Sequence, residues 1–116
     1  MKLYKNISDE KIRTIAVDFD GTLCVGSKFP AIGAPKKELI DYLIACREHG
    51  KKVILWSCRE GADLDAAVGW CRERGLEFDA VNENLASEWL CGNPRKVVAD
   101  LYIDDRASIP VYEEEK

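Results

Sequence analysis

The stretch TIAVDFDGT, at residues 14–22, decides how this chain folds. It opens with a short apolar and β-branched run, and the turn signal Asp20-Gly21 follows within a few residues. This pattern predicts a fully buried strand over residues 14–18. Asp18 and Asp20 then lie at the carboxyl end of that strand, and their spacing of two residues lets both side chains face the same side.

Strands and helices are expected to alternate along the rest of the chain. Residues 35–50 carry an apolar stripe at helical spacing, with a proline in the first turn and a glycine at the end, and this predicts a helix. The apolar run KVILWS at residues 52–57 predicts a second buried strand. The further expected elements are a helix over 62–74, a strand over 77–81, a helix over 85–91 and a strand over 101–103.

This order predicts a single α/β domain over residues 1–116. Parallel strands joined by helices form a sheet that is covered on both faces, with right-handed crossovers. A chain of 116 residues buries roughly two thirds of its unfolded surface, which is enough for one continuous core. The one long irregular piece is residues 21–34, which contains three glycines and a proline. Such a loop inside a compact domain is usually functional or mobile.

The amino-acid composition limits which binding partners and which cellular compartment we expect. Lys and Arg number 17 against 21 Asp and Glu, for a net charge of −4. This near balance argues against nonspecific binding to nucleic acid or to an anionic membrane. No apolar run of membrane-spanning length occurs, and charged residues interrupt the start of the chain, so neither a membrane span nor a signal peptide is expected. The five cysteines form no CxxC pair, which favours a reducing, cytoplasmic location.

Acidic and polar residues gather where the predicted strands end. They are Asp18, Asp20, Ser57, Asp104 and Asp105. Ligands of open parallel sheets bind at the carboxyl ends of the strands. Four clustered carboxylates repel one another unless a cation offsets their charge, and an oxygen-only ligand set favours Mg²⁺. Phosphoryl transfer is the chemistry that this combination favours, because one carboxylate can attack phosphorus while a second donates a proton.

The motifs resemble those of the haloacid dehalogenase-like (HAD) hydrolases, in the same order along the chain. DFDGT at residues 18–22 looks like the first motif of that superfamily, and Ser57 at the end of KVILWS looks like the second. In the segment PRKVVADLYIDDRA, Lys96 resembles the third motif and the acidic pair Asp104-Asp105 the fourth. The resemblance covers residues 14–106 and implies a three-layer αβα, Rossmann-like fold.

The resemblance also implies a role for each matching residue. Asp18 would be the nucleophile and a Mg²⁺ ligand, and Asp20 the general acid and base whose backbone carbonyl also binds the metal. Ser57 and Lys96 would hold the phosphoryl oxygens. Asp104 would bind the metal directly, with Asp105 in contact with it or just outside its coordination sphere.

Three further polar residues lie close to these motifs. Arg59 follows Ser57 by two positions and could clamp a phosphate in a bidentate manner, although a solvated arginine at a helix entry is an equal alternative. Asn82 and Asn84 flank the end of the strand predicted over 77–81, where turn and helix-cap roles explain them.

The hypothesis is a small HAD-like phosphatase without a cap domain, which hydrolyses a phosphomonoester with Mg²⁺ through an aspartyl phosphate. The 37 positions from Asp20 to Ser57 and the 39 from Ser57 to Lys96 leave no room for an inserted lid. Such open sites act on a phosphorylated metabolite or on an exposed phosphate of a larger molecule. A neighbouring copy in a homo-oligomer could also supply the lid.

Two alternatives remain open. One is a phosphotransferase of the same superfamily. The other is a noncatalytic, signalling phospho-accepting module of the receiver type, which also groups acids, a Ser or Thr and a Lys around Mg²⁺. Receivers, however, place their acidic pair on the first strand and the phosphorylated Asp later, which is the reverse of the order here.

Overall fold

A computed structural model describes Tyr4 and residues 7–86 and 92–113 of the chain. The elements are β1 Thr14–Val17, β2 Cys24–Val25, β3 Ala34–Pro35, α1 Lys37–Glu48, β4 Lys52–Leu55, α2 Gly61–Glu73, β5 Ala80–Val81 and β6 Leu101–Ile103. The strand predicted over 77–81 is therefore reduced to its last two residues. The alternation of strands and helices expected from the sequence is confirmed from β1 through α1, β4 and α2 to β5, while the described residues between β5 and β6 contain no helix.

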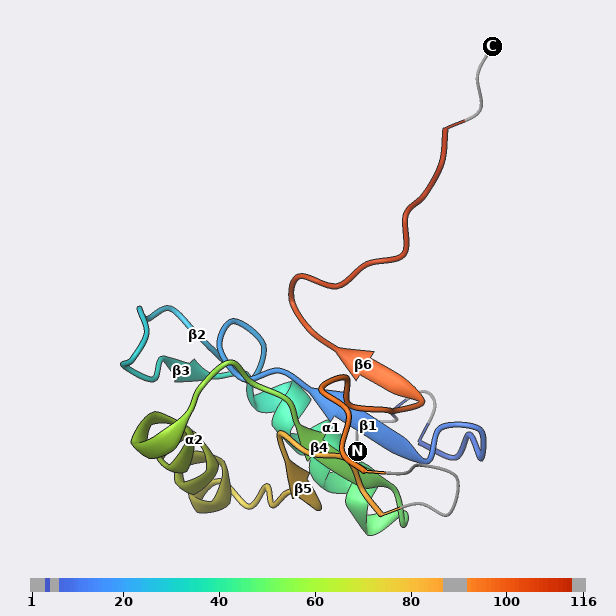
Figure 1. The fold of residues 1–116 in the computed structure, drawn as a ribbon, viewed down its shortest axis with the longest axis horizontal. Coiled ribbons are helices and arrows are strands. Elements are labelled where there is room, and N and C mark those ends of the chain that lie inside the picture. Colours follow the sequence, from blue (N-terminus) through green and yellow to red (C-terminus); the bar gives the residue numbers. More distant parts are fainter. Residues whose placement is uncertain (1–3, 5–6, 87–91, 114–116) are drawn as a thin grey trace.

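Four parallel strands form the main sheet, in the order β5-β4-β1-β6. Figure 1 shows β5 and β6 at opposite edges with β1 and β4 between them. The chain moves from β1 through β4 to β5 on one side and then returns to pair β6 with the other side of β1. The direction of winding thus reverses between β1 and β6, and this reversal is where open parallel sheets bind ligands.

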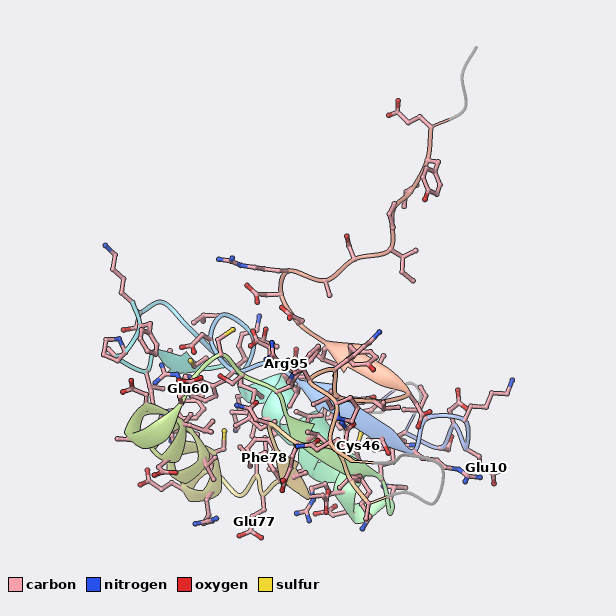
Figure 2. All side chains as sticks on the ribbon, viewed as in Figure 1. Glu10, Cys46, Glu60, Glu77, Phe78 and Arg95 are labelled. Carbon is pink, nitrogen blue, oxygen red and sulfur yellow. The ribbon has the colours of Figure 1, made fainter. Side chains whose placement is uncertain are left out.

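Both described helices pack on one face of the sheet. Alternation along the strands turns Ile15 and Val17 of β1 to this face together with Val53 and Leu55 of β4. The buried helical residues of the same cluster are Ile40, Leu43 and Cys46 of α1 and Ala67 and Cys71 of α2. Cys46, labelled in Figure 2, marks this layer. Coverage of both faces by helices was expected, and the two described helices do not provide it.

The second face is covered instead by the chain that precedes β6. Val97 packs there in a separate buried cluster with Ala16 and Ile54. A helix over 85–91 was predicted for this region. Residues 85 and 86 are irregular, and the rest of that range lies outside the described residues.

The segment at residues 21–34 is more regular than its glycines and proline suggested. Residues near its two ends belong to the antiparallel strands β2 and β3, and residues 26–33 form the loop that connects these strands. Gly33 permits this pairing, because a Cβ there would collide with the backbone carbonyl of Val25. Residues 25–34 are called the flap below.

No helix within the described ranges is both long and apolar enough to cross a membrane. After β6 the chain runs away from the sheet (Figure 1), and Ile109, Val111 and Tyr112 are almost fully exposed.

Candidate metal centre and active site

Three carboxylates meet where the sheet reverses its winding. Asp18 directly follows β1, and Asp104 and Asp105 directly follow β6. The backbone N–H of Asp18 donates to the carbonyl of Ile103 at 2.9 Å, which holds the two strand ends together. One carboxylate oxygen from each of the three acids lies within 4.8 Å of the others. The structure therefore brings together three of the four predicted acids.

Thr22 joins two of these acids from the turn after β1. Its Oγ1 is 3.2 Å from Oδ2 of Asp18 and 3.1 Å from Oδ1 of Asp105, and it accepts the backbone N–H of Asp105 at 3.0 Å. A hydroxyl carries one hydrogen, so it donates to one carboxylate at a time. Gly21 makes the close approach feasible: its φ is +82°, and a Cβ there would lie 2.6 Å from Oδ2 of Asp105.

The electrostatics of this cluster favour a bound cation. Burial raises the pKa of Asp18 to about 6, and repulsion from Asp104 and Asp105 adds to the rise. The backbone N–H of Phe19 and the hydroxyl of Thr22 hydrogen-bond the carboxylate and offset only part of this effect. Three carboxylates without a nitrogen or sulfur ligand are the donor set that suits a hard divalent ion such as Mg²⁺.

The fourth predicted acid, Asp20, points to a different partner. Its carboxylate forms a two-point ion pair with Arg59, in which Nε lies 2.8 Å from Oδ2 and Nη2 lies 2.7 Å from Oδ1. The Asp20 side chain is not one of the three converging acids. The roles predicted for its carboxyl group in proton transfer and for its backbone carbonyl in metal binding stay predictions.

Arg59 lies beneath the flap and is 1% exposed. Besides Asp20, its guanidinium donates to the backbone carbonyls of Pro30, Ala31 and Asp63. The arginine was considered as a phosphate clamp and, alternatively, as a solvated residue. In this conformation it is neither open to a substrate nor solvated.

Ser57 is half-buried in the loop after β4. Its Oγ accepts the backbone N–H of Arg59 at 3.1 Å, and its own N–H donates to Oδ1 of Asn82 at 2.7 Å. Asn82 adopts a φ of 52°, a left-handed conformation that asparagine tolerates better than most residues. Sequence reasoning assigned Asn82 a turn role but did not find its bond to Ser57.

Lys96 is exposed and lies on the rim of a small pocket beside Asp18. The pocket has a volume of about 280 Å³, and Asp18, Lys96 and Asp104 are its charged lining residues. The lysine Nζ lies 6.0 Å from the ring centre of Tyr102, which also lines the pocket. The structure thus places Lys96 at the same hollow as the predicted nucleophile.

Asn84 holds the loop that carries Lys96. Its Oδ1 accepts the backbone N–H of Val98 at 2.7 Å, and its Nδ2 lies 3.2 Å from the carbonyl oxygens of both Pro94 and Lys96. Sequence reasoning gave this asparagine a turn or cap role. A side-chain bond across ten residues or more leaves no local pattern from which it could have been found.

A bigger hollow of about 770 Å³ lies at the opposite, amino ends of β1 and β4. Its lining includes Arg13, His49 and Lys52 but none of the three converging acids. The smaller pocket is therefore the candidate site, because the carboxyl ends of the strands carry both the reversal of winding and the clustered charge.

Comparison with known proteins gives one informative match. No protein-family model matches the chain, and no curated protein matches it either. A solved structure described as that of a conserved protein coded by a locus from Bacteroides thetaiotaomicron is 46% identical, with a TM-score of 0.72. The match covers 84% of this chain and 81% of that chain.

The chain belongs to the family of this Bacteroides protein. Identity at this level over most of both chains establishes a shared fold. The description of the Bacteroides protein names no activity, substrate or metal.

Proposed function

We propose that the protein is a Mg²⁺-dependent phosphomonoester hydrolase of the HAD-like type, which acts through an aspartyl phosphate. The observation that carries this proposal is the convergence of Asp18, Asp104 and Asp105 within 4.8 Å at the reversal of the sheet. A noncatalytic acidic surface has no need for a half-buried acid with a raised pKa at its centre, whereas a nucleophile that shares a cation with its substrate does.

The three carboxylates would hold the metal, and Asp105 would be oriented by its hydrogen bonds with Thr22. When bound, Mg²⁺ supplies the positive charge that neutralises phosphoryl oxygens as the phosphate is transferred. The raised pKa of Asp18 supports this fit, because a cation at this point would remove the repulsion among the three acids.

The chain's own residues would divide the reaction into two steps. A carboxylate oxygen of Asp18 forms a bond to phosphorus while the bond from phosphorus to the ester oxygen breaks, and Asp20 gives that oxygen a proton. Water then attacks the aspartyl phosphate, and Asp20 takes a proton from the water as phosphate leaves. For the first step Asp20 has to leave Arg59, with which its carboxylate is paired, take up a proton from water and turn toward the substrate.

Ser57 and Lys96 would hold the phosphoryl oxygens. The hydroxyl of Ser57 accepts the N–H of Arg59, which leaves its own hydrogen able to reach an anion. Lys96 is exposed at the pocket that Asp18 lines, so its ammonium group can approach the same anion. We further propose that the substrate is a phosphorylated metabolite or an exposed phosphate on a larger molecule. The proposed location is the cytoplasm.

Turnover of p-nitrophenyl phosphate tests this function. We expect hydrolysis with Mg²⁺, loss of hydrolysis in EDTA and recovery when Mg²⁺ is added in excess. Asp18→Asn should lower the rate by more than about a hundredfold, because the amide cannot act as the nucleophile. Asp41→Asn, on the exposed side of α1, is the matched control and should keep the wild-type rate.

Asp104→Ala separates the metal role from the nucleophile role. It should raise the Mg²⁺ concentration needed for half-maximal rate, with part of the activity restored at high Mg²⁺. Full activity in EDTA would contradict the metal role. Phosphorylation of Asp18 without turnover would instead favour the noncatalytic signalling module.

A further inference from the structure

Arg59 has every donor of its guanidinium occupied. The group carries five N–H bonds. Two go to the carboxylate of Asp20, from Nε at 2.8 Å and Nη2 at 2.7 Å. The other three reach backbone carbonyls, from Nη1 to Pro30 at 3.0 Å and Asp63 at 3.5 Å, and from Nη2 to Ala31 at 3.4 Å. No N–H remains for a phosphate in this conformation.

Two of these partners belong to the flap. Pro30 and Ala31 lie at its turn, between β2 and β3. The Phe29 ring, also in the flap, lies 5.0 Å from the guanidinium carbon, and the ring of Phe19 in the core lies 5.1 Å from it. The guanidinium therefore lies within cation–π range of a core aromatic and of an exposed flap aromatic, and this attraction adds to the hydrogen bonds.

The loop that carries Arg59 is itself held in place. Asn82 accepts the N–H of Ser57 and donates to the carbonyl of Arg59 at 3.4 Å. Ser57 in turn accepts the N–H of Arg59. Figure 2 marks the neighbouring Glu60 between the β2–β3 pair and the start of α2, where this loop passes. Arg59 is thus a fixed point to which both Asp20 and the flap are attached.

We propose that Arg59 is a positioning residue that couples the flap to Asp20, so that opening the flap and freeing the Asp20 carboxylate are one event. The two groups share one guanidinium, with Nη2 bonded both to Asp20 and to Ala31. When the flap pulls away, Arg59 loses the contacts that fix its orientation toward Asp20. When Asp20 turns away, a buried guanidinium loses its counter-ion and the flap loses its anchor.

The consequence for catalysis rests on the proposed function. Asp20 cannot donate a proton to a leaving group while both its oxygens accept from Arg59. A substrate that moves the flap would release Asp20 at the moment when the substrate is in place. Arg59 would then limit proton transfer to the occupied site without touching the substrate.

Hydrogen exchange tests the coupling without any need for activity. In Arg59→Met, amide exchange of residues 25–34 should rise by at least about tenfold, because several hydrogen bonds from a charged donor are removed. Exchange in β1 and β4 should change much less. Asp20→Ala should raise exchange in the same flap residues, and the double variant should rise no further than Arg59→Met alone.

Arg47→Met is the matched control. Arg47 also makes a two-point ion pair, with Asp79 at 3.3 Å and 3.2 Å, but it lies on α1, and within the described part of the chain its guanidinium bonds Asp79 and not the flap. This variant should leave flap exchange at the wild-type level. Arg59→Lys should recover part of the protection, because a lysine keeps the charge but not the fork. If Arg59→Met does not fold, Asp20→Ala and Phe29→Ala remove the partners and should both loosen the flap.

Two results would overturn the coupling. In the first, flap exchange in Arg59→Met stays within about twofold of wild type. In the second, exchange rises equally in the flap and in β1 and β4, as simple destabilisation would give. Failure of the proposed function would be seen separately, as absent Mg²⁺-dependent turnover in the wild-type protein. In an active wild type, Arg59→Met should also reduce the difference in rate between aryl and alkyl phosphates, which loss of stability alone would not change.

Discussion

The surroundings of Asp18 disfavour the charged form of its side chain. Burial and the neighbouring acids raise its pKa from 3.8 to about 6. A folded pKa above the unfolded one means that the folded protein binds this proton more tightly. The contribution of Asp18 to stability is therefore greatest at low pH, falls as the pH rises through the range from about 4 to 6, and leaves a penalty at neutral pH.

Asp18→Asn should consequently stabilise the metal-free protein. In EDTA at pH 8 we expect a gain of about 1 to 2 kcal/mol after allowance for solvent screening, and little gain at pH 4. Thermal unfolding at both pH values measures the difference. Adding Mg²⁺ should raise the melting temperature of the wild type more than that of the variant. A variant that is less stable than wild type at pH 8 in EDTA would show that repulsion among the acids is not the controlling effect.

Replacement of the Asp20 carboxyl group should affect proton transfer more than substrate binding. Asp20→Asn keeps an oxygen for Arg59 but removes the proton-transfer group, so alkyl phosphates, whose leaving groups need a proton, should lose more rate than aryl phosphates. Steady-state rates with p-nitrophenyl phosphate and an alkyl phosphate of similar size give the comparison. Equal losses for both esters would assign the acid role elsewhere.

Among the elements, the loop at residues 93–98 depends on one side chain. The amide of Asn84 bonds the backbone at Pro94, Lys96 and Val98, and so fixes where Lys96 emerges. Asn84→Ala should raise KM for a phosphate ester by about tenfold with a smaller effect on kcat, since the lysine binds the phosphoryl group before and during reaction. Asn93→Ala, which removes only the Asn93 Oδ1 contacts with Asn84, should have a weaker effect. A kcat loss without a KM change would argue against a binding role.

The helices and the longer strands could be predicted because their signals are local. The apolar spacing over residues 35–50 and the run KVILWS produced α1 and β4 with small errors at their ends. The pairing of β2 with β3 was missed, because two strands of two residues each carry no periodicity. The environment of Arg59 was missed for a different reason: its partner Asp20 lies 39 positions away, and only the folded chain brings them together.

At the scale of the whole molecule, the acid cluster was predictable and its exact membership was not. Parallel strands bring their carboxyl ends to one edge, so acids that follow β1 and β6 had to meet once those strands were neighbours. The rotation of the Asp20 side chain away from that edge depends on a buried arginine in a loop, which is a property of packing. Sequence patterns predict where strands end, but they do not predict in which direction the side chains just beyond those ends point.

The openness of the site leads to the last prediction. The described residues form the sheet with its two helices and the flap, and none of them forms a cap domain. The pocket beside Asp18 is lined by strand ends and by the chain around Lys96 and Ala107, with a volume of about 280 Å³. A small ester can therefore be gripped at few points besides its phosphate, and little remote binding energy is available.

We therefore expect KM for p-nitrophenyl phosphate to lie in the millimolar range, toward the upper end of common enzyme values. Esters whose phosphate ends a larger molecule, such as phosphorylated metabolites and oligonucleotide ends, should show lower values if they reach further contacts outside the pocket. A second copy of the chain could also close the site, and KM would then fall as the protein associates. Rates measured over a wide range of protein concentration distinguish this closure from an open monomeric site. A micromolar KM for the small ester in a protein that stays monomeric would mean that the site closes over its substrate, and the flap tied to Arg59 would be the first segment to test.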